Sequence, residues 1–189
     1  YNAINGGFKH LKETFDNIRE MKIIGTFLIA FWMYEDGVAT IVRMAAKIAS
    51  SLGFAAGDII TAILMVQFIG FPAALGYNWF AKKIGTKNAV LVAILGYVVI
   101  TLLGYLMTDI THFYILAALI GLFQGGIQSL SRSLFTRLVP PYKEAEFFGF
   151  YNMLGKFAAV VGPILVGWIT VLTGNPRAGI LSIVVLFII

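Results

Sequence analysis

The sequence has no cysteine, only two histidines and few charged residues among its 189 positions. The lack of cysteine excludes disulfides and thiolate metal ligands in this chain. The histidines, His10 and His112, are too far apart in the sequence to suggest a pair of ligands, so we expect no metal site and no cofactor. Only 12% of the residues are charged, against about a quarter in an ordinary soluble domain. So few charges cannot cover the chain with polar surface, which points to lipid rather than water as its surroundings.

Enzyme motifs are also missing. No apolar segment has a histidine near its centre, and the patterns H-E-x-x-H and G-x-S-x-G do not occur, so we expect no enzyme. The net charge of +5 could suggest nucleic acid. However, most Lys and Arg residues lie in short segments between apolar runs, as in the cytoplasmic loops of membrane proteins. We therefore expect no nucleic-acid partner.

Hydrophobic residues are abundant instead: they make up 59% of the chain, and the mean hydropathy is +0.88. A membrane-spanning helix needs about 20 predominantly apolar residues. Six apolar segments, the sixth shorter than the rest, lie at about 23–50, 59–80, 88–108, 110–135, 147–172 and 178–189. Apolar and polar residues do not alternate over any length, which argues against strands. The sequence predicts an all-α, polytopic helix bundle in a lipid bilayer over residues 23–189.

Residues 1–22 form a polar stretch before the first apolar segment. Its apolar positions recur every three or four residues and so share one helical face: Phe8, Leu11, Phe15 and Ile18. A cytoplasmic linker with an amphipathic helix in the membrane interface and the solvated end of a linker both fit this pattern. The chain opens on Tyr1 and closes within an apolar run, so we expect a fragment whose last helix is truncated.

Two further patterns concern the bundle as a whole. If the N-terminus is cytoplasmic, ten Lys and Arg residues fall on the inside and three on the outside, which is the usual bias of membrane proteins. We therefore expect the first residues to be cytoplasmic. Small residues four positions apart, such as Gly121 with Gly125 and Gly155 with Ala159, predict close packing between helices.

The first apolar segment is interrupted by Glu35, Asp36 and Gly37. Ionisable groups within a membrane are costly and usually face a cavity or a partner. Two interpretations of Glu35 and Asp36 are open: one of them takes a proton or binds a cationic group, or they form a structural pair with Arg43 or another helix. Gly37 predicts a break or bend of the helix at this point, and a broken helix frees backbone groups that can meet a solute.

Lys156 lies near the middle of the fifth segment, with Asn152 one turn before it on the same face. That segment contains no acid, so Lys156 needs a partner elsewhere: Glu35, Asp36, a solute carboxylate or a group outside this chain. We interpret Lys156 and Asn152 as candidates for solute binding or proton coupling. A purely structural salt bridge is the alternative.

Polar residues also repeat every four positions along the fourth segment, at Gln124, Gln128 and Arg132. They predict a polar wall of a translocation path, with hydrogen bonding between helices as the alternative for the two glutamines. Arg132 lies near the cytoplasmic end, where it is a gate candidate with Glu144 or Glu146 as its partner.

Among the aromatic residues, Tyr34 and Tyr151 lie beside the charged positions and are candidates for stacking on a ligand. Trp79 lies near a span end, where aromatic residues usually mark the membrane interface. Gln67 is the lone amide of the second segment and fits either a cavity lining or a helix contact.

Several stretches resemble a known family: GIQSLSRSLF at 126–135, LVP at 138–140, EAEFFGFYN at 144–152 and GKF at 155–157. They resemble the vacuole-effluxer-like branch of the major facilitator superfamily, which includes fungal vacuolar amino-acid effluxers and many bacterial proteins. The YEDG sequence at 34–37 is similar too. The resemblance implies helices seven to twelve of a twelve-helix transporter, with a missing N-terminal six-helix half as partner, in a bacterial cytoplasmic membrane.

One loop departs from the superfamily pattern. Major facilitators often carry G-x-x-x-D-R-x-G-R-K between helices two and three, with a weaker copy between helices eight and nine. Alignment on Gly85 places Asn78 at the first glycine, Lys82 at the acid, Lys83 at the arginine and Lys87 at the final base. Only basic character survives, and Lys82 and Lys83 remain candidates for a cytoplasmic gate.

Together these features predict a secondary active transporter that moves a small polar solute by alternating access, driven by a proton or a counter-solute. The resemblance implies amino acids as one solute class, and a site holding Lys156 with Glu35 or Asp36 would suit zwitterions. A non-transporting receptor or assembly protein built on a transporter fold is the alternative.

Overall fold

The computed structural model describes residues 22–140 and 143–188, which form helices and no strand. The pattern predicted for residues 1–22 lies outside the described residues, apart from Lys22. In chain order the helices are α2 (Lys22–Ser51), α3 (Ala56–Ile84), α4 (Thr86–Tyr105), α5 (Ile110–Leu138), α6 (Glu144–Phe157), α7 (Val161–Thr173), α8 (Pro176–Leu181) and α9 (Val184–Ile188).

Four helical stretches of this part of the chain are long and apolar enough to cross a membrane: Ala56–Ile84, Thr86–Tyr105, Ile110–Leu138 and Glu144–Thr173, the last taken across α6 and α7. α2 has the length, with 30 residues, but Glu35 and Asp36 lower its hydropathy. The predicted all-α, polytopic membrane bundle is thereby confirmed.

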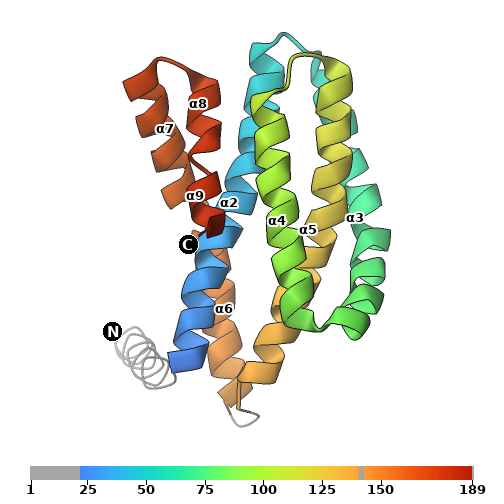
Figure 1. Cartoon of the computed structure of the whole chain (residues 1–189), viewed down its shortest axis with the longest axis vertical. Coiled ribbons are helices and arrows are strands. Elements are labelled where there is room, and N and C mark those ends of the chain that lie inside the picture. The colour runs from blue at the N-terminus through green and yellow to red at the C-terminus, as the bar shows by residue number, and fades with distance from the viewer. Residues whose placement is uncertain (1–21, 141–142, 189) are drawn as a thin grey trace, which may run out of the picture.

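α2 runs through the middle of the bundle, where it packs against α3, α4, α5, α6, α7 and α9. On one side of it stand α3, α4 and α5 and on the other side α7–α9, while α6 overlaps the lower half of α2 in this view (Figure 1). Large apolar side chains fill the core between them, among them Ile41, Ile100, Leu116 and Ile180. Polar side chains of α2 therefore reach both sides of the bundle.

α3 and α5 approach each other closely at glycines. A Cβ atom at Gly121 would lie 2.9 Å from the carbonyl oxygen of Val66, and one at Gly125 would meet the backbone carbonyl of Gly70. Without side chains at these positions the two backbones come together, as small residues allow in membrane helices. The close packing predicted from Gly121 and Gly125 is confirmed.

The fifth apolar segment is broken in the middle. α6 ends at Phe157, α7 begins at Val161, and between them Ala159 has a φ of 76°, in the left-handed region that non-glycine residues rarely adopt. Pro163 favours a break at this point. In a continuous helix its ring would clash with the carbonyl of Ala159, four residues earlier, whereas the first turn of a new helix tolerates proline.

The break predicted at Gly37 is wrong, because α2 continues through this residue. Gly37 has a packing role instead: a Cβ atom there would lie 2.8 Å from Cζ of Phe187 in α9. The glycine therefore lets the aromatic ring press against the α2 backbone.

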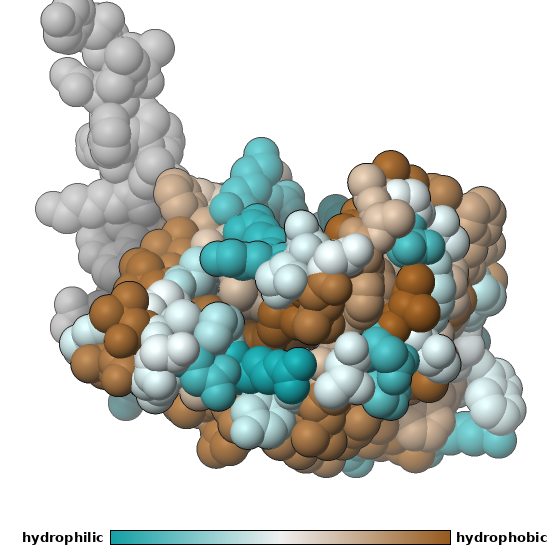
Figure 2. All heavy atoms as spheres, turned by 90° about the horizontal axis from the view of Figure 1, so that it is seen from above, coloured by the Kyte–Doolittle hydropathy of each residue, from teal (hydrophilic) through white to brown (hydrophobic). Residues whose placement is uncertain are grey.

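The flanks of the bundle are strongly apolar. Phe68 is 78% exposed and Val171 is 81% exposed, which is unfavourable in water but expected against lipid or a neighbouring helix. Seen from above, hydrophilic side chains gather on the end of the bundle and hydrophobic ones reach its sides (Figure 2). This distribution fits helices that run across a bilayer.

Candidate functional site

A cavity of about 510 Å³ lies between α2, α5 and α6 and contains most of the charged candidates. It is lined by Phe31, Glu35, Gln128, Arg132, Tyr151, Asn152, Gly155 and Lys156. Gln128 and Arg132 lie one turn apart on α5, and Asn152 and Lys156 lie one turn apart on α6, so each pair points to one side of its helix. The fold thus brings one acid, two bases and two amides from three helices into one space.

The charged groups of this cavity do not neutralise one another directly. Within the described residues, Glu35 forms no ion pair with Lys156 or Arg132, and the pair with Arg43 that was the alternative for Glu35 or Asp36 is not formed. Arg132 lies over the ring of Phe148, with Cζ 5.7 Å from the centroid. An acid and two bases are therefore present without a fixed internal pairing, and each can respond to a charged solute.

Asp36 is not part of this cavity, although it follows Glu35 in the sequence. It is 1% exposed and points at the start of α7. Its Oδ2 accepts a hydrogen bond from the N–H of Val161 at 2.7 Å, and its Oδ1 accepts one from Gly162 at 3.0 Å. A helix N-terminus has free N–H groups and a partial positive charge. Here a carboxylate from another helix accepts hydrogen bonds from these N–H groups and offsets the partial charge.

α2 also provides a hydrogen-bond donor at the other side of the break, where α6 ends. Nε1 of Trp32 donates a hydrogen bond to the carbonyl oxygen of Phe157, at 3.3 Å, where α6 ends. Trp32 and Asp36 are one turn apart, so a single face of α2 contacts both broken ends. Neither role was predicted from sequence, although Pro163 was an available signal for a break between α6 and α7.

The two tyrosine candidates have different surroundings. The hydroxyl of Tyr34 is buried and donates to Oγ of Ser131 at 2.7 Å, so this side chain connects α2 to α5 outside the cavity. Tyr151 lines the cavity. Its ring stacks on Phe31, with 4.1 Å between centroids, and on Phe135, with 4.8 Å. Tyr151 and Phe31 thus form an aromatic wall beside the charged groups.

Of the gate candidates, Arg132 lines the cavity, whereas the others lie at the start of α6 and at the end of α3. Glu144 and Glu146 are exposed in the first turn of α6, and the structure forms no ion pair between Arg132 and Glu144, both of which are described. Lys82 and Lys83 lie in the last turn of α3, where positive charge is favourable. Nζ of Lys83 lies 3.8 Å from the ring centroid of Trp79. A gate built from these residues stays a prediction.

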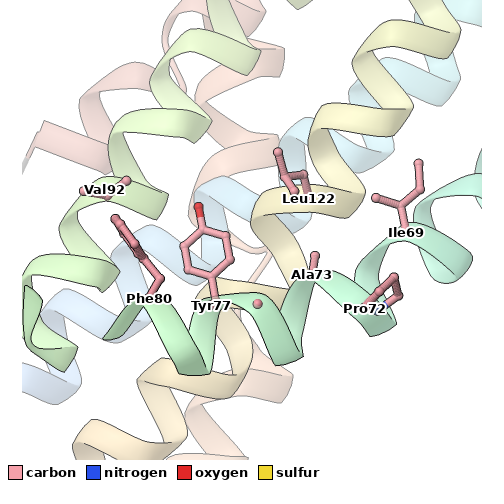
Figure 3. A pocket seen from close by; sticks show the side chains of 8 residues that line it. Ile69, Pro72, Ala73, Tyr77, Phe80, Val92 and Leu122 are labelled. Carbon is pink, nitrogen blue, oxygen red and sulfur yellow. The ribbon is translucent and has the colours of Figure 1, made fainter. Parts of the chain in front are cut away.

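Two more hollows border α3 and α5. One, of about 370 Å³, is lined by Gln67, Gln124 and Gln128 among other residues. The other, of about 560 Å³, is apolar and is formed by side chains of α3, α4 and α5, with Tyr77 as its main polar group (Figure 3). Its lining contains no charge, so it does not suit a polar solute. Within the described part of the chain no group of His, Asp and Glu residues is arranged to hold a metal ion.

Comparison with known proteins matches the entire chain, residues 1–189, to the family described as vacuole effluxer Atg22 like. The chain is 37% identical over 182 residues to the uncharacterized MFS-type transporter YxiO of Bacillus subtilis, covering 96% of this chain and 42% of that protein. It is 31% identical over 200 residues to autophagy-related protein 22 of Yarrowia lipolytica, covering 100% and 34%.

The chain thus spans between a third and about two fifths of the length of these relatives. No solved structure matches it. The resemblance expected from the motifs at 126–157 is confirmed over the whole sequence. The chain belongs to the vacuole effluxer Atg22-like family of the major facilitator type.

Proposed function

We propose that this chain forms one half of the solute path of a secondary active transporter working by alternating access. The solute is small and polar and carries both charge signs, as an amino acid does. The observation that carries the proposal is the cavity in which Glu35, Lys156 and Arg132 meet without pairing. Charges left without a fixed partner in a membrane are expected on a substrate or proton path.

The roles follow from the charges. Lys156 and Arg132 bind the solute carboxylate, Asn152 and Gln128 donate or accept further hydrogen bonds, and Glu35 binds the ammonium group. Glu35 can exchange that ammonium for a proton, which would couple solute movement to a proton gradient. The aromatic wall of Phe31 and Tyr151 excludes water from one side. We further propose a bacterial cytoplasmic membrane, with residue 22 toward the cytoplasm.

Lys156→Ala is expected to reduce solute counterflow by at least about tenfold, since a charge-assisted hydrogen bond is worth about 1.5–3 kcal/mol. The measurement uses the complete protein in proteoliposomes with a panel of labelled amino acids, peptides and sugars. Lys47→Ala, at an exposed position of α2 outside the cavity, is the matched control.

Three outcomes are informative. Loss of flux in the Lys156 variant alone supports the proposed path. Flux that survives equally in both variants would keep the transporter and assign Lys156 a structural role. If folded wild-type protein moves nothing across the panel, a receptor or assembly protein becomes the better description.

Glu35→Gln is expected to abolish the acceleration of uptake by an imposed pH gradient while leaving counterflow measurable, because glutamine keeps the size of glutamate but cannot exchange a proton. Uptake would be followed at fixed solute concentration with and without the gradient. Asp36→Asn is the control from the adjacent position, and it should retain gradient dependence, since its side chain faces α7 rather than the cavity. If Asp36→Asn abolishes the response to the pH gradient and Glu35→Gln retains it, the assignment of proton coupling to Glu35 is wrong.

A further inference from the structure

All three glutamines of the chain line one cavity. Gln67 comes from α3, whereas Gln124 and Gln128 lie one turn apart on α5. The space between the helices measures about 370 Å³, and no charged residue is among the residues that line it. Gly70 and Gly125 also line it, so the close approach of the two backbones leaves the amides as its main polar groups.

One atom of this cavity lacks a partner. Oε1 of Gln124 is buried and accepts no hydrogen bond from any described residue. A buried polar atom without a partner is costly, and such atoms are uncommon in folded proteins. Hydrogen bonding between helices, the alternative considered for Gln124 from sequence, does not account for this oxygen. Because Gln124 lines the cavity, a rotation of its side chain would bring this acceptor to a group that enters.

The glutamine cavity adjoins the charged one. Gln128 lines both of them, so the two spaces meet at a single side chain of α5. A solute whose charged groups bind Glu35 and Lys156 could therefore place a neutral end beside Gln124. The two cavities together divide the path into a charged compartment and an uncharged, hydrogen-bonding compartment.

We propose that the glutamine cavity is a specificity subsite that accepts the uncharged, hydrogen-bond-donating end of the transported solute, such as a hydroxyl or amide group. Oε1 of Gln124 is the acceptor. This inference rests on the proposed transport function and goes beyond it by naming the side-chain class. A solute with an apolar end of the same size would leave the oxygen buried and unpaired, and sites of this kind discriminate strongly against such analogues.

The test compares solutes that differ only by a hydroxyl or a methyl group: serine with 2-aminobutyrate, and homoserine with norvaline. Counterflow of each is measured with the complete protein and with Gln124→Met, which keeps the length of the side chain but removes its polar atoms. Gln124→Leu is a second variant in case the first folds poorly. Thr101→Val is the control, because the buried hydroxyl of Thr101 already donates to the carbonyl of Tyr97 in its own helix.

We expect wild type and the control to carry the hydroxyl member of a pair at least about tenfold better in kcat/KM. In Gln124→Met this ratio should fall to near one, because kcat/KM falls for the hydroxyl solute and stays unchanged for its methyl counterpart. The variant should also melt at a higher temperature, because an unpaired buried oxygen has been removed.

Equal transport within each pair by wild type, or an unchanged ratio in both Gln124 variants, would overturn the subsite and leave the transporter standing. If wild type carries neither member of either pair, the amino-acid-like function fails, and the subsite fails with it. The two failures are distinguished by whether any flux is observed.

Discussion

Asp36→Leu is expected to lower the free energy of unfolding by about 3 kcal/mol, because it removes two hydrogen bonds to a charged group, each worth about 1.5 kcal/mol. The carboxylate of Asp36 is buried and accepts from the N–H groups of Val161 and Gly162 at the start of α7. Leucine cannot accept either bond, so the first N–H groups of α7 would lose their partner. The denaturant midpoint of the purified protein in mixed micelles, followed by circular dichroism, measures the change.

Two further variants separate the loss of these hydrogen bonds at the start of α7 from other effects of substitution. Asp36→Asn keeps one acceptor oxygen and should lose only about half as much stability. Thr40→Val removes the bond from Oγ1 of Thr40 to Oδ1 of Asp36, which is long at 3.3 Å, and should change stability least. An unfolding midpoint for Asp36→Leu equal to that of wild type would show that α7 does not depend on this cap.

Gly125→Ala is expected to destabilise the bundle by about 2 kcal/mol, within the usual range for overpacking. The added methyl group would meet the backbone of Gly70, and a backbone cannot move aside as a flexible side chain can. α3 and α5 would have to separate at their closest point. The same denaturant titration in mixed micelles measures the effect.

The matched control for this substitution is Gly76→Ala on α3. A Cβ atom at Gly76 meets nothing within 4 Å, so the same change should stabilise the helix by up to about 1 kcal/mol. The two alanines are thus expected to act with opposite signs. If both stabilise the protein, the close contact between Gly125 and Gly70 is absent from the folded protein in micelles.

Much of the fold was predictable because its signals are local in the sequence. Long uncharged runs indicate helices in lipid wherever they occur, and the four-residue spacing of Gly121 and Gly125 indicates a close contact whatever its partner is. The polar positions Glu35, Gln128 and Lys156 were also visible, since a polar group in an apolar run is conspicuous. That they line a common cavity required only that α2, α5 and α6 be neighbours.

The features that could not be predicted depend on contacts between distant segments. Glu35 and Asp36 look equivalent in the sequence, and only the position of α7 shows that one faces a cavity while the other caps a helix. Gly37 looked like the place for a break, but its role is to make room for Phe187. That Oε1 of Gln124 is buried without a partner likewise depends on how α3 and α5 pack, which the sequence does not give.

The surroundings of Asp36 also limit which acid can stand at each of the two positions. A Cβ atom at Gly162 would lie 2.9 Å from Oδ1 of Asp36, so the space around this carboxylate is already filled. A glutamate at this position would need room for another methylene group, whereas Glu35 opens into a cavity that offers it. Exchanging the order Glu-Asp along α2 for Asp-Glu is therefore expected to disturb the packing at the start of α7: the shorter acid stands where the space is filled, and the longer acid stands where a cavity gives it room.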